Sequence, residues 1–316
     1  MSVPVLSRIG IGTYLGKDTE TVNDEYVDTI VEACARGINV IDTAVNYRRQ
    51  RSEHAIETAM LHLKGRGIKR DQLFIATKGG YIPGDARATM SMQNIFRDTL
   101  LRNGVMKTEE IVDGCHCIAA AYLKHSLKLS LRNLRMDRID LFYVHNPEAQ
   151  LAENNRPVFE ARIREAFVAL EQEAGEGRIG AYGMATWNGF RVDPEAQEYL
   201  DLHRLWDLAR EAGGENHHFR YIQGPYNGAM TELRDLKNQR GVSTLDAATT
   251  LGLKVFTSAT LSQGKLAAAK SGPASDYAGS PAQASIRFVL STPGIACALV
   301  GMKSKEHLDE NLAALD

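Results

Sequence analysis

The segment IAAAYLKHSLKLSLRNLRMDRIDLFYVH, residues 118–145, contains the unit that decides the fold. Its first part, Ile118–Leu134, has the spacing of a helix, and its last part, Ile139–His145, is a short and nearly continuous apolar run. Such runs, when helices separate them, are typical of a parallel sheet whose faces are covered by those helices. The segment is therefore predicted to be one helix–strand unit of an α/β fold.

The same alternation of strands and helices continues toward both ends of the chain. Further short apolar runs predict strands over Ser7–Tyr14, Ile38–Ala44, Leu73–Thr77, Ile179–Ala185, Tyr221–Pro225, Lys254–Ser258 and Ala296–Val300. Longer segments between them predict helices over Asp24–Arg36, Ser52–Leu63, Ile163–Ala174, Pro194–Ala212, Thr244–Leu251, Pro281–Leu290 and Lys305–Leu315. We expect Gly37 to end the first of these helices and Ser52 to cap the second.

The number of units indicates how the sheet is closed. About eight strand–helix units in 316 residues is the size expected of a (β/α)8 TIM barrel. An open, doubly wound sheet is the alternative that the same alternation allows. No change of composition and no linker rich in Pro or Ser divides the chain, so we expect residues 1–316 to form a single domain.

Two segments are too long to be plain connections between neighbouring elements. They cover about residues 81–115, with a short helix expected before Gly104, and about residues 260–280. Each follows the C-terminal end of a predicted strand, which is the face where barrel enzymes bind their ligands. We therefore expect both segments to be loops or lids over a substrate.

Composition excludes several classes of function. A formal net charge of −2 gives no reason to expect a nucleic-acid partner or an anionic membrane surface. The first residues, MSVPVLSRIG, lack the basic start and apolar stretch of a secretory signal, and no apolar run approaches the roughly 18 residues of a membrane span. The four cysteines are scattered, which favours a reducing, cytoplasmic location over a disulfide framework. The spacing of Cys115, His116 and Cys117 is wrong for a zinc site, so we expect no metal.

A glycine-rich stretch near the N-terminus, residues 10–16, resembles a dinucleotide-binding fingerprint at first sight. Its spacing is GxGxxxG, and no helix follows the turn directly. The Rossmann pattern requires a strand, a tight turn and a helix in immediate succession. We therefore interpret this stretch as a first strand and its turn.

Polar side chains recur at the ends of three predicted strands. Asp42 ends the strand INVID, Lys78 follows FIAT, and His145 ends LFYVH, while Tyr47 lies five residues after Asp42. Each residue alone has an ordinary explanation, as a turn cap, a solvated lysine or a core histidine. In a barrel, however, strand ends converge on one rim, so the four side chains are predicted to meet there.

These four residue types together can reduce a carbonyl group. A tyrosine hydroxyl has an ordinary pKa near 10, and a neighbouring Lys78 ammonium is expected to lower it toward the working range. Asp42 would hold the ammonium charged, and a neutral His145 would donate a hydrogen bond to the carbonyl oxygen. Tyr47 would then protonate that oxygen as general acid. The hydride must come from a cofactor, because no side chain supplies one.

Three stretches of the chain resemble the aldo-keto reductase superfamily. They are GINVIDTAVNY at 37–47, ATK at 76–78 and IDLFYVHNP at 139–147. The resemblance spans nearly the whole chain and implies Asp42, Tyr47, Lys78 and His145 as the catalytic tetrad. It also implies a (β/α)8 barrel and an NAD(P)H-dependent oxidoreductase that reversibly reduces an aldehyde, ketone or sugar carbonyl. The partner implied is a small carbonyl or alcohol substrate.

The same resemblance implies where a nicotinamide cofactor would lie, across the C-terminal mouth of the barrel. The matching positions are Thr13, Tyr14, Asp42, Thr186, Gln223, Ser258, Lys303, His307 and Asn311. Lys303 could pair with a 2′-phosphate, which favours NADP(H) over NAD(H). This chain has Ala185-Thr186 where the family often has Ser-Asn, and Arg48, Arg49 and Arg51 follow Tyr47 where the family has smaller residues. We expect these arginines to be solvated rather than to bind an anion.

Two other functions fit parts of the same pattern. Lys78 could form a Schiff base in a barrel lyase or aldolase, although a nearby Asp42 would keep its amine protonated. A barrel could also bind the cofactor as a redox sensor or regulatory subunit with little turnover. The complete set of four polar residues favours the reductase over both.

Overall fold

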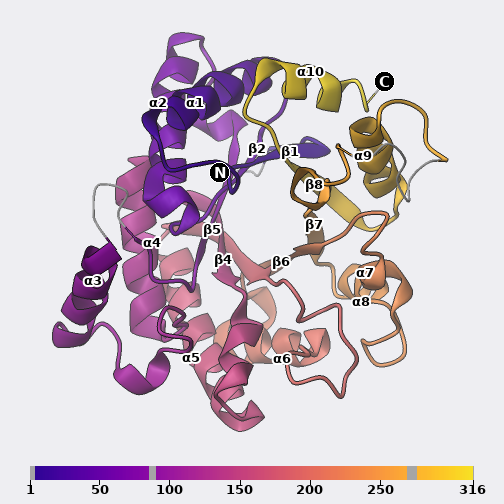
Figure 1. The fold of residues 1–316 in the computed structure, drawn as a ribbon. Helices are drawn as coiled ribbons and strands as arrows, with labels where there is room; N and C mark the ends of the chain where they lie inside the picture. Colours follow the sequence, from indigo (N-terminus) through magenta and orange to yellow (C-terminus); the bar gives the residue numbers. More distant parts are fainter. Residues whose placement is uncertain (1–3, 85–89, 269–275, 316) are drawn as a thin grey trace.

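The computed structural model describes residues 4–84, 90–268 and 276–315 of the chain. Within them, neighbouring strands pair in parallel in the order of the sequence, and β8 pairs with β1 to close a barrel (Figure 1). The strands are β1 (Ile9–Gly12), β2 (Val40–Asp42), β3 (Phe74–Gly79), β4 (Ile139–His145), β5 (Ile179–Ala185), β6 (Phe219–Pro225), β7 (Lys254–Ser258) and β8 (Ile295–Gly301). The predicted (β/α)8 barrel is confirmed, and the open sheet is excluded.

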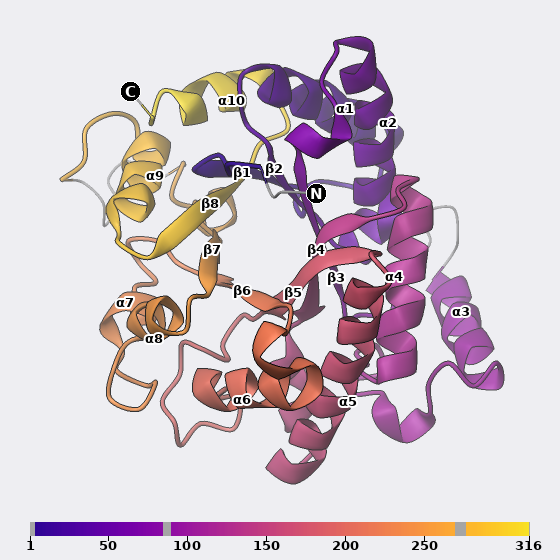
Figure 2. The same ribbon diagram turned by 180° about the vertical axis from the view of Figure 1, so that it is seen from behind.

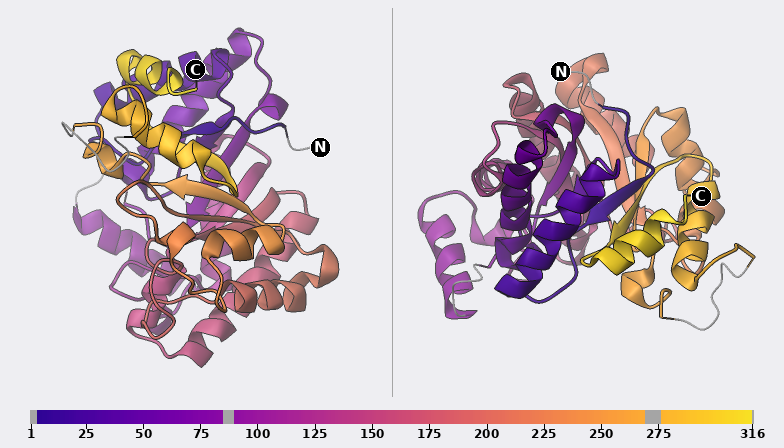
Figure 3. Two further views of the ribbon diagram at one scale, coloured as in Figure 1. Left: turned by 90° about the vertical axis from the view of Figure 1, so that its right-hand side faces the viewer. Right: turned by 90° about the horizontal axis from the view of Figure 1, so that it is seen from above.

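Helices surround the barrel on its outside (Figure 2). They are α1 (Glu20–Ala35), α2 (Arg51–Gly65), α3 (Met90–Arg102), α4 (Ala120–Leu134), α5 (Arg156–Gly175), α6 (Leu202–Gly213), α7 (Glu232–Asp235), α8 (Thr244–Thr250), α9 (Pro281–Ser291) and α10 (Lys305–Leu312). The last helix, α10, packs against the first helix, α1 (Figure 3). Of these described helices, none is long and apolar enough to cross a bilayer.

Element boundaries differ from the predictions where a side chain caps a helix. Helix α5 begins earlier than predicted, because Asn155 accepts a hydrogen bond from the Val158 amide. Helix α6 begins later, because Asp201 caps it and the residues before it form turns. The prediction that Ser52 caps α2 is wrong. Ser52 lies inside the first turn, and its buried hydroxyl donates to the Thr13 carbonyl oxygen at 2.7 Å.

Alternation along the strands determines which residues enter the barrel. One buried cluster consists of strand residues that include Val40, Phe74, Ala76, Leu141, Tyr143, Tyr221 and Phe256. The intervening residues belong to a second cluster shared with the helices, among them Ile41, Ile75, Phe142, Val144, Ile56 and Leu127. Because side chains alternate between faces, Asp42, Lys78 and His145 continue the interior rows of their strands. At the C-terminal ends of these strands, the apolar interior of the barrel is therefore followed by these three polar side chains.

Gly183 in β5 makes room for the interior. A Cβ atom there would lie 2.2 Å from the Tyr221 carbonyl oxygen and 2.9 Å from Cε1 of Tyr143. Neither distance is compatible with a side chain, and the nearest atom belongs to the backbone of the neighbouring strand. The glycine thus allows β5 and β6 to approach while the Tyr143 ring fills the barrel.

The long segment after β3 is folded against the outside of the barrel. The predicted short helix is present as α3, Met90–Arg102. The segment's ends are tied together, since the Ile82 amide donates to the Cys115 carbonyl and the Cys117 amide to that of Gly80, both at 2.7 Å. Ile82, Leu100 and Tyr122 belong to a small apolar cluster of their own. In the described residues, hydrogen bonds and an apolar cluster therefore hold this segment against the barrel, and it is not an open loop.

We predict that Gly183→Ala lowers the free energy of unfolding by about 1–3 kcal/mol, the range expected for forced overpacking. Urea unfolding followed by circular dichroism measures the change. The control is Gly175→Ala at the end of α5, where an added Cβ meets nothing within 4 Å. That variant should gain about 0.5 kcal/mol. Equal stability of the two variants would contradict the steric account of Gly183.

Candidate active site

A cavity of about 900 Å³ opens at the C-terminal ends of the strands. Its lining includes Asp42 at the end of β2, His145 at the end of β4 and Ser258 at the end of β7. From there it extends to Lys303 and Asn311 in and before α10. One continuous cavity therefore joins the predicted catalytic residues to the segment after the last strand.

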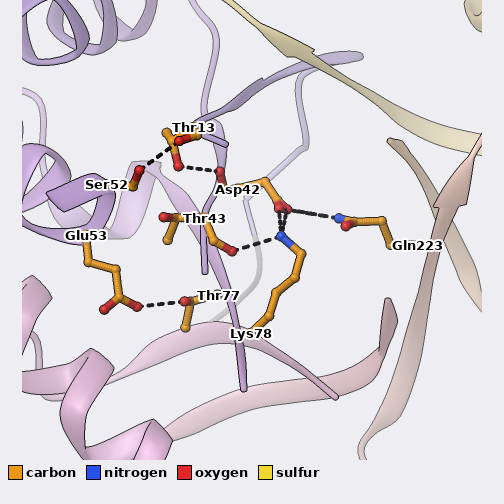
Figure 4. A network of polar contacts seen from close by, with 8 residues as sticks. All are labelled: Thr13, Asp42, Thr43, Ser52, Glu53, Thr77, Lys78 and Gln223. Atoms are coloured by element: carbon orange, nitrogen blue, oxygen red, sulfur yellow. Dashed lines mark hydrogen bonds and ion pairs between the residues drawn. The ribbon is translucent and has the colours of Figure 1, made fainter. Parts of the chain in front are cut away.

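Asp42 and Lys78 form a buried ion pair at the bottom of this cavity (Figure 4). The Lys78 ammonium donates to Asp42 Oδ1 at 2.6 Å, to Asp42 Oδ2 and to the Thr43 carbonyl oxygen at 2.9 Å. These bonds use all three of its protons. Gln223 Nε2 donates to Asp42 Oδ1 at 2.9 Å. Burial lowers the pKa of Lys78, and the Asp42 carboxylate opposes that shift.

Tyr47 lies directly above the ion pair, in the turn that follows β2. The Lys78 ammonium is 4.8 Å from the centre of its ring, a cation–π distance. Burial raises the pKa of Tyr47 well above 10, and Asp42 adds to the shift. The expectation that the pKa of Tyr47 falls toward the working range is therefore wrong, because desolvation and the Asp42 carboxylate both raise it. Tyr47 carries its proton throughout the neutral pH range.

His145 is neutral, as expected from the sequence. Burial lowers its pKa well below 6.5, and the Lys78 charge lowers it further. Its ring centre is 5.8 Å from that of Tyr47, in an edge-on arrangement. Its carbonyl oxygen lies 2.8 Å from Nε2 of the buried His116. A neutral imidazole keeps one N–H to donate to an oxygen in the cavity.

The structure brings the four predicted catalytic residues together. Asp42, Tyr47 and His145 line the cavity, while Lys78 lies beneath them with 1% of its surface exposed. They come from β2, β3, β4 and the turn after β2, so the strand ends converge as the barrel requires.

All nine positions that the resemblance assigned to a cofactor line the same cavity. Polar atoms of its wall have no partner in the described part of the chain. They are Asn46 Oδ1, His145 Nδ1, Thr186 Oγ1, Thr260 Oγ1 and Asn311 Nδ2, all of them buried atoms. Buried polar groups normally find a hydrogen-bond partner. The wall therefore fits an elongated ligand with polar groups along its length.

Lys303 already has a partner, Glu25 of α1, at 3.2 Å. Both side chains are 40% exposed, so their attraction is weak and screened by solvent. This pair could not be predicted from the sequence, because its members lie 278 positions apart. A phosphate group would have to compete with Glu25 for the lysine.

Glu148 is a site residue that the sequence analysis missed. Its Oε1 accepts the backbone N–H groups of Trp187 at 2.6 Å and Asn188 at 3.0 Å. It thereby holds the loop after β5, where Thr186 and Trp187 line the cavity. Burial raises the pKa of Glu148 to about 6. The sequence feature that could have identified Glu148 as a site residue is its position three residues after His145.

We expected the arginines after Tyr47 to be solvated, and for Arg48 this expectation is wrong. Arg48 is 7% exposed and stacks on the Tyr26 ring, 5.0 Å from its centre. Its Nε donates to the Lys17 carbonyl oxygen at 3.1 Å. Arg48, Arg49 and Gln50 all have left-handed backbone angles, with φ of 48°, 52° and 72°. This corner fixes the turn that carries Tyr47.

The described residues contain no group of three His, Cys, Asp or Glu side chains arranged to hold a metal. The closed barrel and the cavity together define the class of protein: a (β/α)8 barrel with a charged, polar cavity at the C-terminal ends of its strands. The aldo/keto reductase family model matches residues 8–198, which is more than half of the chain. The chain belongs to the aldo/keto reductase family.

Similar proteins include reductases of bacteria. The NADH-specific methylglyoxal reductase of Escherichia coli K12 is 26% identical over 205 residues, covering 63% of this chain and 53% of that protein. The 6-dehydroglucose reductase of Agrobacterium fabrum C58 is 25% identical over 189 residues, covering 58% and 50%. The chain thus spans about half the length of the curated relatives it matches.

Solved structures agree on the fold. The aldo/keto reductase from Klebsiella pneumoniae in complex with NADP and acetate has a TM-score of 0.66 and 22% identity to this chain. The match covers 98% of this chain and 86% of that one. At this identity the likeness supports the barrel alone.

We predict that the free energy of unfolding decreases as the pH rises from 4.5 to above 6, because the contribution of protonated Glu148 is lost. A carboxyl whose pKa is raised to about 6 from an ordinary 4.5 binds its proton more tightly in the folded state. Its stabilising contribution is present below pH 4.5 and lost as the pH passes 6. The loss is about 2 kcal/mol.

Urea unfolding of the wild type and of Glu148→Gln across this pH range measures the effect. The difference between the two profiles isolates Glu148 from other titrating groups. Parallel profiles would contradict the assignment. Glu165→Gln is a suitable control for the loss of a carboxylate, since Glu165 is exposed on α5.

Proposed function

We propose that the protein is an NAD(P)H-dependent reductase of an aldehyde, ketone or sugar carbonyl. One observation carries the proposal: a buried ion pair lies beneath a protonated tyrosine and beside a neutral histidine in one cavity. A protonated phenol and a neutral imidazole both donate to a carbonyl oxygen. A fixed ammonium stabilises the negative charge that develops on that oxygen.

Each residue has a distinct role in this proposal. Tyr47 gives its proton to the carbonyl oxygen, and His145 donates a hydrogen bond that orients the same oxygen. Lys78 lowers the cost of leaving negative charge on Tyr47, and Asp42 keeps Lys78 charged and in place. A bound nicotinamide would supply the hydride, which no residue of the chain can provide.

The remaining cavity fits the rest of such a cofactor. The unpartnered atoms of Thr186 and Asn311 stand at separate parts of its wall, and Gln223, Ser258 and His307 also line it. Lys303 is the cation available to a 2′-phosphate, and we propose NADP(H) as the preferred form. A relative of this chain is named as NADH-specific, so the preference needs its own test.

The Schiff-base alternative has less support from the geometry. The Lys78 amine is absent from the cavity lining, and its three protons are bonded to Asp42 and Thr43. A carbonyl carbon in the cavity would have to displace those bonds before the amine could attack. Nothing in the described residues favours a sensor without turnover over an enzyme. All four cysteines are free thiols, and we propose a cytoplasmic location.

We predict that Tyr47→Phe lowers kcat for carbonyl reduction by about 10²–10⁴-fold, the usual contribution of general acid catalysis. The ring and its contacts remain, so nucleotide affinity should change by less than about twofold. Steady-state oxidation of NADPH measures the first quantity and fluorescence titration the second. Unchanged turnover would rule out Tyr47 as the proton donor.

We predict that Lys303→Ala weakens NADPH binding by roughly tenfold, as expected for one charged hydrogen bond. NADH binding should stay nearly constant, because NADH lacks the 2′-phosphate. Glu25→Gln should strengthen NADPH binding, since it frees the lysine. Fluorescence titrations with both nucleotides decide the point. An equal loss for NADH and NADPH would refute the proposed NADP(H) preference.

A further inference from the structure

The loop after β1 forms one wall of the cavity. Thr13, Tyr14 and Leu15 of this loop line the cavity, as does Tyr26 of α1. The Tyr14 ring packs edge-on against the Tyr47 ring, with the two centres 5.0 Å apart. Because this ring covers one side of the proposed proton donor, the position of the loop decides how closely Tyr47 is surrounded by protein.

Arg48, the residue after Tyr47, holds this loop by its backbone. Its Nε donates to the Lys17 carbonyl oxygen at 3.1 Å. Its Nη2 donates to the Thr19 carbonyl oxygen at 3.4 Å and to Asn23 Oδ1 at 3.3 Å. The guanidinium is planar and its donors point in fixed directions, so one side chain can bind several acceptors at once. We call these three hydrogen bonds the Arg48 contacts.

Tyr26 of α1 connects Arg48 to the same loop. The guanidinium carbon of Arg48 lies 5.0 Å from the centre of the Tyr26 ring. The Tyr26 hydroxyl donates to the Leu15 carbonyl oxygen at 2.7 Å. Both side chains are buried, and hydrogen bonds of a charged donor are strong where water does not compete for them. The loop is therefore held at residues 15, 17 and 19.

Two ion pairs join the same turn to the same loop. Arg49 pairs with Asp18 at 3.3 Å, and Arg51 pairs with Glu20 at 2.7 Å. The acidic partners are 39% and 76% exposed, so solvent screens both attractions. Of these three arginines, Arg48 is the buried one, and we expect its contacts to contribute most to holding the loop.

The charged and titratable groups that face Tyr47 come from several elements. They are Asp42 of β2, Lys78 of β3, Tyr81 after β3, His145 of β4 and Tyr14 of the loop after β1. Burial raises the pKa of Tyr47, and the charges of Asp42, Tyr14 and Tyr81 add to the shift. If the loop moves away, Tyr47 loses part of its burial and its neighbour Tyr14. Its pKa then falls toward the ordinary value of 10.

We infer that Arg48 is a positioning residue for the proton donor: its contacts with the loop after β1 keep Tyr14 packed against Tyr47. The inference rests on the proposed role of Tyr47 as general acid. In the described part of the chain Arg48 does not line the cavity. It acts through the loop and Tyr14, by fixing the place of the phenol and limiting its contact with water.

Arg48→Met tests the inference, because methionine keeps an unbranched stem beside Tyr26 and removes the Arg48 contacts. It should lower kcat for carbonyl reduction by about 10–100-fold, the cost expected when a reacting group is displaced by about 1 Å. The alkaline fall of kcat/KM should also begin at a lower pH than in the wild type, because a less buried Tyr47 loses its proton more easily. A smaller active fraction would lower kcat equally at every pH. An unchanged pH profile overturns the inference.

Two glycine variants separate the Arg48 contacts from backbone strain. Arg48 has a φ of 48° and Arg135, directly after α4, has a φ of 49°, so glycine relieves the backbone at both positions. The Arg135 side chain is 79% exposed and pairs with Glu57. Arg48→Gly should match Arg48→Met in kcat and pH profile, and Arg135→Gly should match the wild type. Wild-type behaviour of Arg48→Gly, which lacks the contacts, overturns the inference.

If the Arg48 variants do not fold, Tyr26→Phe decides the question. It keeps the ring beside the guanidinium and removes the hydrogen bond to the Leu15 carbonyl oxygen. The alkaline fall of kcat/KM should begin at a lower pH than in the wild type. Tyr199→Phe is the matched control, because the Tyr199 hydroxyl bonds to the Asn238 carbonyl oxygen and lies outside the cavity lining. A wild-type pH profile in Tyr26→Phe then overturns the inference.

Nuclear magnetic resonance gives a readout that does not depend on turnover. In protein labelled with ¹³C at the Cζ atoms of tyrosine, the Tyr47 signal is the one missing from Tyr47→Phe. It should titrate at a lower pH in Arg48→Met than in the wild type, and equal titration overturns the inference. If Tyr47→Phe keeps full turnover while this difference is observed, the proposed function fails and the positioning by Arg48 stands.

Discussion

The buried ion pair of Asp42 and Lys78 is the interaction on which the rest of the site depends. Two charges removed from water are costly unless hydrogen bonds satisfy them fully. Here the Lys78 ammonium donates to Asp42 and to the Thr43 carbonyl oxygen, and Gln223 donates a further hydrogen bond to the Asp42 carboxylate. The register of β2 and β3 makes this possible, since Asp42 pairs with Ala76 and Lys78 follows two residues later on the same face. A register shift of one residue would place the charges on opposite faces.

The pair also contributes to the protonation of its neighbours. The positive charge of Lys78 helps to keep His145 neutral, and the negative charge of Asp42 adds to the high pKa of Tyr47. Burial is the larger cause in both cases. The site is therefore in its proton-donating state before any ligand arrives, with the imidazole and the phenol both carrying a proton. Such preorganisation removes the cost of rearranging dipoles during the reaction.

Alternation along the strands made much of this predictable. Asp42, Lys78 and His145 each end an apolar run in the interior row, which is visible without coordinates. Contacts between distant segments were not visible: Arg48 reaches Lys17, Glu148 holds Trp187, and Lys303 meets Glu25. The direction of the Tyr47 shift was also wrong, because a sequence shows the neighbouring charge and hides the desolvation. Helix starts were misplaced where Asn155 and Asp201 supply caps that only the folded backbone identifies.

The left-handed run of Arg48, Arg49 and Gln50 has a consequence for how this region can change by mutation. Side chains other than glycine or asparagine seldom adopt that conformation, and each such residue costs of order 1 kcal/mol or more. Glycine at position 48 would relieve the backbone and forfeit the stacking and hydrogen bonds of the guanidinium. Any single replacement therefore trades one loss for another. A tolerated substitution in the turn that carries Tyr47 therefore requires accompanying substitutions, including in the loop at Lys17.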